Sequence, residues 1–149
     1  MNILFVCTGN TCRSPMAEYF ARRYIEENNL ENFKVTSAGI NAATGENASE
    51  EAIEVMEEKG IDITMHKSKM LMEEDLKEND KVLTMTNSHK EVIQDMYDYD
   101  NVYTLKHFVN TCEDCDILDP YGFGVDKYRE TRDEIEDAVK KLLEKLNDK

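Results

Sequence analysis

The fold of this chain is decided at residues 3–15, which read Ile3-Leu4-Phe5-Val6-Cys7-Thr8-Gly9-Asn10-Thr11-Cys12-Arg13-Ser14-Pro15. The apolar run at residues 3–6 is typical of a buried strand, and the pattern after Pro15 is helical. We interpret Ser14 as the N-cap of that helix and Pro15 as its first residue. Gly9 and Asn10 both tolerate positive φ, so the connecting loop can curl around an anion.

This loop places a cysteine and an arginine six positions apart, at Cys7 and Arg13. Backbone N–H groups and the helix dipole make such a loop a phosphate site, and the same field favours a thiolate. The planar guanidinium of Arg13 can hold two phosphate oxygens. The pattern therefore indicates phosphoryl transfer with Cys7 as nucleophile, and the alternative is a buried cysteine beside a surface arginine. The predicted phosphate-binding residues are Thr8, Gly9, Asn10, Thr11, Cys12, Arg13 and Ser14.

Strands and helices alternate along the rest of the chain. Strand-like runs lie at residues 3–7, 33–37, 82–85 and 102–105, and apolar residues spaced by three and four predict helices around 16–25, 52–60, 92–97 and 128–146. This alternation predicts an α/β fold, a doubly wound parallel sheet with helices on both faces, in one domain covering residues 1–149. Such sheets bind ligands beyond the carboxyl ends of their strands, where the loop after the first strand lies.

Composition narrows the function classes. The net charge of −14 argues against nucleic-acid binding, and most of the acidity fits solvated helix surfaces. No stretch approaches the roughly 18 apolar residues of a membrane span, and the N-terminus lacks the layout of a signal peptide. We therefore expect a cytoplasmic protein without membrane contact, whose four cysteines are mostly reduced.

Three stretches resemble the low-molecular-weight protein tyrosine phosphatase family. Residues 6–18, Val6-Cys7-Thr8-Gly9-Asn10-Thr11-Cys12-Arg13-Ser14-Pro15-Met16-Ala17-Glu18, are similar to its signature, Thr36-Ser37-Ala38-Gly39 to a second element, and Asp119-Pro120-Tyr121 to its general-acid loop. The resemblance spans nearly the whole chain. It implies a four-stranded flavodoxin-like sheet of order 2-1-3-4, no cofactor or metal, and phosphorylated proteins as substrates of a monomeric enzyme.

The resemblance also implies roles for individual residues. Asp119 would be the acid that protonates the leaving group and then activates water, although without the family it ranks only slightly above Asp116. Ser14 would donate a hydrogen bond to the thiolate, and capping the helix is its plainer role. Loop support would come from Asn10, Ser14, Ser37 and His66, the last of which would otherwise pass for an ordinary surface histidine.

The remaining cysteines leave alternatives open. Cys12 resembles a partner that forms a disulfide with Cys7 under oxidation, and a small buried residue is the other interpretation. Cys112 and Cys115 could be a redox pair or half of a zinc site. Zinc would need two more ligands, and recruiting Cys7 and Cys12 would remove the nucleophile, so we favour two ordinary loop thiols.

Position 11 bears on the substrate. Thr11 resembles the bacterial protein-arginine-phosphatase branch, whereas typical tyrosine-specific members carry isoleucine, and a polar side chain suits a guanidinium leaving group. Ile40 stands in a region with no aromatic wall for phosphotyrosine, and Tyr121 can line the pocket. We therefore predict phosphoarginine as substrate.

Three alternative functions remain: a phosphatase acting on phosphotyrosine, a thiol-dependent arsenate reductase, and a phosphate-binding module without turnover. Residues 82–97 lack the extra cysteines that such reductases usually carry there, and an intact Cys7, Arg13 and Asp119 argues against a mere binding module.

Overall fold

Four parallel strands form the centre of the molecule. The computed structural model describes residues 1–110 and 116–148. The strands are β1 (Asn2–Cys7), β2 (Lys34–Gly39), β3 (Lys81–Thr84) and β4 (Val102–Thr104), in the spatial order β2-β1-β3-β4. Cys7 pairs with Gly39 on one side of β1, and Val6 pairs with Thr84 on the other. The predicted sheet and its strand order are confirmed.

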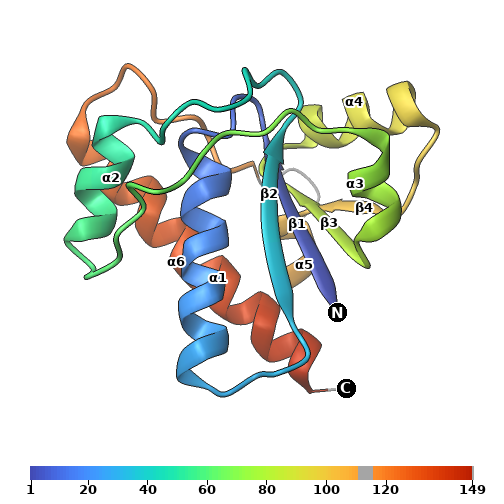
Figure 1. Ribbon diagram of the computed structural model, residues 1–149, viewed down its shortest axis with the longest axis horizontal. Coiled ribbons are helices and arrows are strands. Elements are labelled where there is room, and N and C mark those ends of the chain that lie inside the picture. Colours follow the sequence, from blue (N-terminus) through green and yellow to red (C-terminus); the bar gives the residue numbers. More distant parts are fainter. Residues whose placement is uncertain (111–115, 149) are drawn as a thin grey trace.

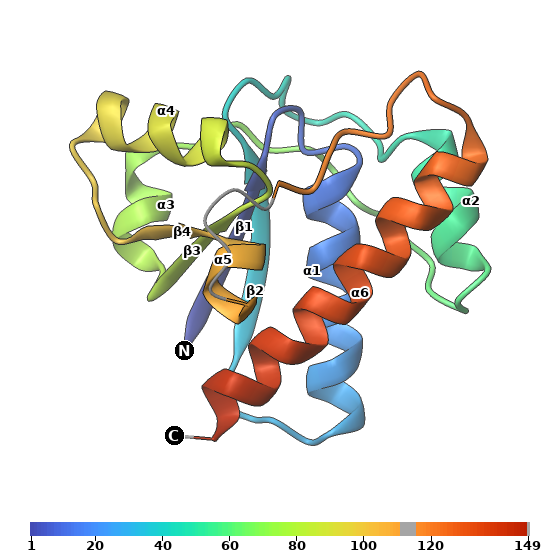
Figure 2. The ribbon, with the colours of Figure 1, turned by 180° about the vertical axis from the view of Figure 1, so that it is seen from behind.

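Helices cover both faces of this sheet (Figures 1 and 2). Alternate residues of β1 face opposite sides, because side chains along a strand alternate. Ile3 and Phe5 pack in the core formed with α1 (Arg13–Glu27), α2 (Glu50–Glu57), α5 (Leu105–Asn110) and α6 (Val125–Asn147). Leu4 and Val6 pack in a smaller core with α3 (Glu73–Glu78) and α4 (Asn87–Tyr97). An interior strand buried on both faces explains the continuous apolar run at the start of the sequence.

Element ends differ from the predictions at several points. Leu105, predicted to end the last strand, begins α5, because Thr104 Oγ1 accepts a hydrogen bond from the His107 N–H at 3.2 Å and so starts a helical turn. The short helices α3 and α5 were not predicted, and α4 begins five residues earlier than its apolar pattern, at Asn87. Helix α2 ends at Glu57, and Gly60 adopts the left-handed φ of +74° that terminates this segment.

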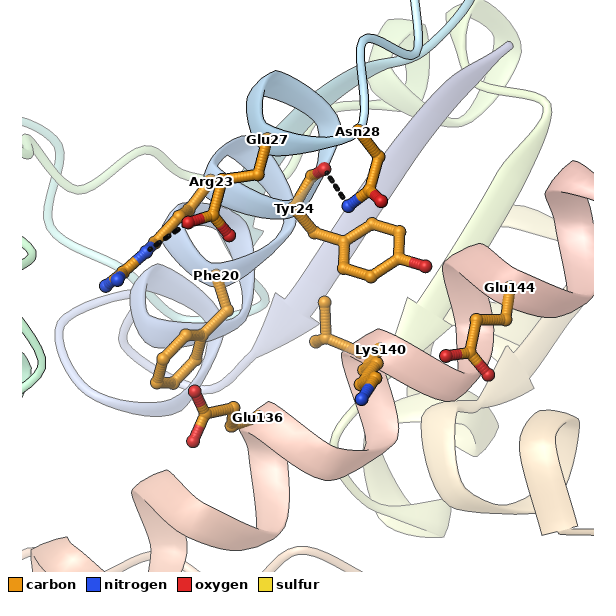
Figure 3. A pocket seen from close by; sticks show the side chains of 9 residues that line it. Phe20, Arg23, Tyr24, Glu27, Asn28, Glu136, Lys140 and Glu144 are labelled. Carbon is orange, nitrogen blue, oxygen red and sulfur yellow. Dashed lines mark hydrogen bonds and ion pairs between the residues drawn. The ribbon is translucent and has the colours of Figure 1, made fainter.

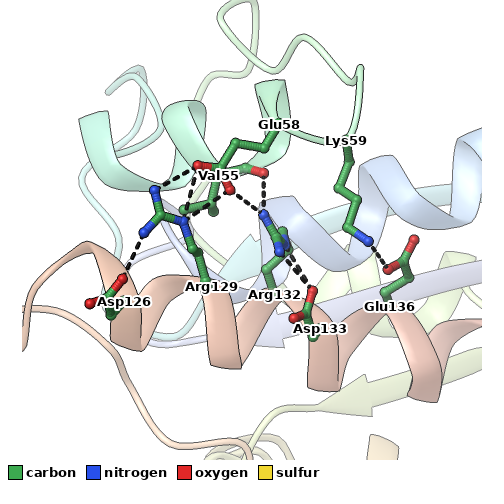
Figure 4. Close-up of polar contacts among 8 residues, drawn as sticks. All are labelled: Val55, Glu58, Lys59, Asp126, Arg129, Arg132, Asp133 and Glu136. Carbon is green, nitrogen blue, oxygen red and sulfur yellow. Dashed lines mark hydrogen bonds and ion pairs between the residues drawn. The ribbon is translucent and has the colours of Figure 1, made fainter.

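A cluster of charges joins α2 to α6 (Figure 4). The carboxylate of Glu58, just beyond α2, accepts hydrogen bonds from the guanidinium groups of Arg129 and Arg132 at 2.8 and 2.6 Å. Arg132 also donates to the Val55 carbonyl at 3.0 Å, which satisfies a carbonyl in the last turn of α2. These contacts hold α2 and α6 together beside the loop that follows β1.

Among the residues that the structure describes, no helix is long and apolar enough to cross a membrane.

Candidate active site

Cys7 ends β1 and lies at the base of the loop that leads into α1. Its side chain is buried, and its Sγ lies 2.9 Å from the hydroxyl of Ser14. Ser14 is the second residue of α1, so its prediction as N-cap is wrong: Cys12 holds that position and makes no side-chain cap. The Ser14 hydroxyl is instead turned toward the cysteine, where it can donate a hydrogen bond to a thiolate.

Asn10 is the centre of the polar contacts that shape the loop. It is fully buried and has a φ of +57°, whereas Gly9, which also tolerates positive φ, does not adopt it. The Asn10 amide donates to Ser14 Oγ at 2.8 Å and to Ser37 Oγ at 2.9 Å. Its side-chain carbonyl accepts from the Lys69 N–H, and its backbone carbonyl lies 2.8 Å from His66 Nε2. The structure thus brings together the four residues predicted to support the loop.

Glu18 belongs to the same network, although the sequence alone does not single it out. Its buried carboxylate accepts a hydrogen bond from Ser37 Oγ at 2.5 Å and forms an ion pair with Arg22. A charge on the buried side of α1 needs such partners, because burying a carboxylate alone is costly. The available signal was its position four residues after Ser14, which places both on one side of a helix.

Arg13 and Asp119 lie far apart in the sequence, and the fold brings them together. The Arg13 guanidinium is buried, and its Nη1 donates to the Ile117 carbonyl at 2.8 Å. Its Nη2 lies 3.8 Å from the Asp119 carboxylate, which is half exposed and also accepts from the Tyr121 N–H at 3.1 Å. The guanidinium is thereby fixed in orientation between the loop and the segment before α6.

Asp116, the competing candidate for the acid, has a different place. Its Oδ1 accepts a hydrogen bond at 2.8 Å from the Asn87 N–H, the first amide of α4. A carboxylate at a helix N-terminus satisfies an otherwise unpaired donor, which is a structural role. Of the two carboxylates, Asp119 is the one paired with Arg13.

Cys12 contacts two hydroxyl groups away from the nucleophile. Its Sγ lies 3.1 Å from Tyr128 Oη on α6 and 3.4 Å from Ser49 Oγ before α2. Burial raises the pKa of the Cys12 thiol, which favours its protonated form. Both Cys7 and Cys12 are free thiols in this structure. Cys112 and Cys115 lie outside the described residues.

The predicted pocket residues lie in the phosphate loop and in two segments whose residues contact it. Thr11 is half-buried, and its Oγ1 lies 3.8 Å from Cys12 Sγ. Ile40 is half-buried after β2, and its N–H donates to the Cys7 carbonyl at 3.0 Å. Tyr121 is 68% exposed, so its ring is free to contact a bound molecule.

A pocket without any residue of the phosphate loop lies between α1 and α6 (Figure 3). This cavity of about 520 Å³ is lined by aromatic side chains such as Phe20 and by charged residues of both signs, including Arg23, Glu27 and Lys140. No residue of the phosphate loop lines it, so we do not assign the chemistry to it. Among residues 1–110 and 116–148, no group of three or more His, Cys, Asp or Glu side chains is placed to hold a metal ion.

Comparisons of this chain with a family model, with named proteins and with solved structures all point to the same family of phosphatases. A family model described as low molecular weight phosphotyrosine protein phosphatase matches residues 2–149. A protein named protein-arginine-phosphatase from Bacillus subtilis (strain 168) is 43% identical over 148 residues, covering 98% of this chain and 97% of the relative. Its namesake from Geobacillus stearothermophilus is 44% identical over 146 residues, covering 97% and 95%. A solved YwlE arginine phosphatase, a mutant with a phosphorylated active site serine, superimposes with a TM-score of 0.94 at 42% identity, covering 99% of this chain and 96% of the other.

Proposed function

This chain belongs to the low molecular weight phosphotyrosine protein phosphatase family, and we propose that its substrate within that family is phosphoarginine in proteins. It is a hydrolase that removes phosphoryl groups from proteins. One arrangement carries the assignment of roles: the Cys7 thiol lies 2.9 Å from the Ser14 hydroxyl in a loop whose far end holds Arg13 3.8 Å from Asp119. This arrangement supports one site in which Cys7 is the nucleophile, Arg13 the anion-binding cation and Asp119 the acid.

The first half of the reaction transfers the phosphoryl group to the enzyme. The Cys7 thiolate attacks phosphorus, an S–P bond forms, and the P–N bond of phosphoarginine breaks. Asp119 gives its proton to the departing guanidine nitrogen, so the arginine side chain leaves without a negative charge on that nitrogen. Arg13 and the loop N–H groups bind the phosphoryl oxygens and stabilise their negative charge in the transition state of this step.

The second half releases inorganic phosphate. Asp119, now a carboxylate, takes a proton from a water molecule as its oxygen attacks phosphorus. The S–P bond breaks, and the electron pair returns to the Cys7 sulfur, which leaves as a thiolate. The Ser14 hydroxyl at 2.9 Å can donate a hydrogen bond to that sulfur and so favours its departure. The enzyme ends in the state in which it began.

Arg13 suits its role because its orientation is fixed before substrate arrives. The bond from Nη1 to the Ile117 carbonyl at 2.8 Å sets the plane of the guanidinium. An oriented cation loses little conformational entropy when phosphate binds, and its fork matches two phosphate oxygens. This local cation is needed because the whole chain carries a net charge of −14, which repels an anionic substrate at long range.

The choice of phosphoarginine is supported by the mouth of the loop. Thr11 offers a hydroxyl beside the phosphate site, and among the described residues its side chain makes only the long 3.8 Å contact with Cys12 Sγ. The oxygen of a hydroxyl in that position can accept a hydrogen bond from an N–H of the guanidinium group, whereas the ring of phosphotyrosine has no N–H to donate. Ile40 and the exposed Tyr121 would flank the leaving group. Two relatives covering nearly the whole chain bear the name protein-arginine-phosphatase.

The specificity can be tested with two peptides of the same sequence, one carrying phosphoarginine and the other phosphotyrosine. The wild type should have the higher kcat/KM on phosphoarginine, and Thr11→Ile should shift the ratio toward phosphotyrosine by roughly 10- to 200-fold, the usual worth of one such contact. Thr36→Ile is the matched control, since it makes the same change on an exposed position of β2. A wild type that prefers phosphotyrosine, or an unmoved ratio in Thr11→Ile, would contradict the assignment.

We further propose that residues 1–149 form one catalytic domain that works as a cytoplasmic monomer. A single sheet with both faces covered supports one domain. A catalytic thiol that must stay reduced supports the cytoplasm.

A further inference from the structure

His89 is a buried histidine that the reaction described above does not use. It is the third residue of α4, its side chain is 4% exposed, and its backbone N–H donates to the N-cap hydroxyl of Thr86 at 3.2 Å. Its Nε2 lies 2.8 Å from Thr8 Oγ1. Thr8 directly follows the nucleophile Cys7, so α4 reaches the first residue of the phosphate loop.

The sheet brings these two residues together. Strands β1 and β3 are parallel neighbours, with Val6 opposite Thr84, and the Met85 N–H donates to the Val6 carbonyl at 3.0 Å. Neighbouring parallel strands end at the same edge of a sheet, so the loop after β1 meets the start of α4. The side chain of a residue in the first turn of a helix leans back toward the helix N-terminus, which turns His89 toward Thr8.

The imidazole of His89 is neutral around pH 7. Burial is the main cause, and the nearby Arg13 guanidinium adds to it; together they lower the pKa of His89 to about 4. The carboxylates of Asp116 and Asp119 act in the opposite direction and are outweighed. A neutral imidazole carries one N–H and one lone pair on its two nitrogens.

The surroundings of the second nitrogen decide where that hydrogen lies. His89 Nδ1 is buried and has no hydrogen-bond partner within the described part of the chain. A buried N–H without an acceptor is rarer in proteins than an acceptor that lacks a donor. The hydrogen therefore belongs on Nε2, which donates to Thr8 Oγ1. The Thr8 hydroxyl then has its own hydrogen to donate elsewhere.

We propose that His89 is a positioning residue that orients the Thr8 hydroxyl as a donor to an oxygen of the bound phosphoryl group. The imidazole occupies one lone pair of Thr8 Oγ1 and restrains its rotamer, while the side chain stays exposed at the mouth of the loop. A hydroxyl held in this way meets a phosphoryl oxygen with little loss of freedom. This role rests on the proposed phosphatase chemistry at Cys7, but not on the choice of phosphoarginine.

A double-mutant cycle tests the proposal with p-nitrophenyl phosphate as substrate and inorganic phosphate as inhibitor. Thr8→Val should lower kcat/KM about tenfold or more, as expected for a hydrogen bond to a charged group, and weaken phosphate inhibition. His89→Leu should lower kcat/KM by up to about the same factor. Because His89 acts through Thr8, the double variant should be no worse than Thr8→Val alone.

Two conservative variants separate this role from simple packing. His89→Gln keeps an N–H near the Nε2 position, and Thr8→Ser keeps the hydroxyl, so both should recover most of the activity. Melting temperatures of all variants show whether any has lost its fold. Multiplicative losses in the double variant would overturn the proposal, as would a His89→Gln variant that is folded but as impaired as His89→Leu.

The same experiment distinguishes the two proposals. A wild type that hydrolyses p-nitrophenyl phosphate but not phosphoarginine refutes the substrate assignment, and the cycle still reports on His89. A wild type without any hydrolysis refutes the phosphatase function. Binding of inorganic phosphate measured by calorimetry then gives the same cycle, and equal affinities in wild type and Thr8→Val would refute the role of His89.

Discussion

Replacing Gly39 with alanine should displace the phosphate loop and lower kcat/KM, although Gly39 is not part of that loop. Gly39 ends β2 opposite Cys7, and a Cβ placed on it would lie 2.5 Å from the Thr8 carbonyl oxygen and 3.0 Å from the Asn10 nitrogen. It would also lie 2.9 Å from Ala42 Cβ. Two of these neighbours are backbone atoms of the loop, which cannot turn away as a flexible side chain can.

The strand cannot easily retreat either. The Gly39 N–H donates to the Lys69 carbonyl at 2.9 Å, and the Gly39 carbonyl accepts from the Leu71 N–H at 2.8 Å. The loop must therefore move. Overpacking of this kind costs about 1–3 kcal/mol, which for a domain of this size lowers Tm by roughly 2–12 °C. A displacement of the loop N–H groups by about 1 Å should reduce kcat/KM on the order of 100-fold.

The assay is kcat/KM on p-nitrophenyl phosphate, measured well below the Tm of each variant. Gly45→Ala is the matched control: its φ of +94° makes alanine strained, but nothing lies within 4 Å of the added Cβ. That variant should lose about 1 kcal/mol of stability and keep wild-type kcat/KM. If folded Gly39→Ala keeps kcat/KM within about threefold of wild type, the reasoning from close backbone approach is refuted.

Cys7→Ser should abolish turnover while circular dichroism stays native, since a serine hydroxyl is a far weaker nucleophile here; substantial activity would identify another nucleophile. Asp119→Asn should slow kcat by roughly 10² to 10⁴, most on substrates with poor leaving groups, whereas a larger loss in Asp116→Asn would reassign the acid. Hydrogen bonds from Arg129 and then Arg132 lower the pKa of Glu58 to about 2, below its unfolded value of 4.5. Its stabilisation is therefore present above about pH 4.5 and lost as pH falls toward 2, so the Tm difference between wild type and Glu58→Gln should shrink over that range; a constant difference would contradict this.

The sheet could be predicted because its signals are local and repeated. Short apolar runs alternate with helical stripes, and the family resemblance supplied the strand order. The ends of elements depend on single contacts that no periodicity reveals. Leu105 reads as the end of a strand, yet the Thr104 hydroxyl caps a helical turn at that point. Ser14 and Pro15 read as a helix start, yet the Ser14 hydroxyl is engaged by Cys7 and Asn10 instead.

In the candidate site too, some residues could be predicted from a local pattern and others could not. Cys7 and Arg13 share one short loop, so their relation is visible in the sequence. Without the family resemblance, the sequence separates Asp119 only slightly from Asp116, whereas in the folded chain their partners differ: Arg13 for Asp119 and the start of α4 for Asp116. His89 contacts Thr8 across 81 positions, and Glu18 contacts Ser37 across 19. A buried polar residue whose partner is distant in sequence leaves no local pattern to find.

The contacts of the loop lead to a prediction that separates substrate choice from phosphate binding. The shape of the loop depends on the buried side chains of Asn10, Ser14 and Ser37, and on the Thr11 carbonyl, which accepts from the Ser49 N–H at 2.9 Å. The Thr11 side chain takes no part in these bonds, and its contact with Cys12 is too long to be a strong one. On the proposed role of Thr11, a substitution at this position should change what the leaving group contacts and leave the phosphate site intact. Thr11→Ile should therefore bind inorganic phosphate as tightly as the wild type even where its substrate preference is reversed, and a weakened phosphate affinity would show that the two functions of the loop are coupled.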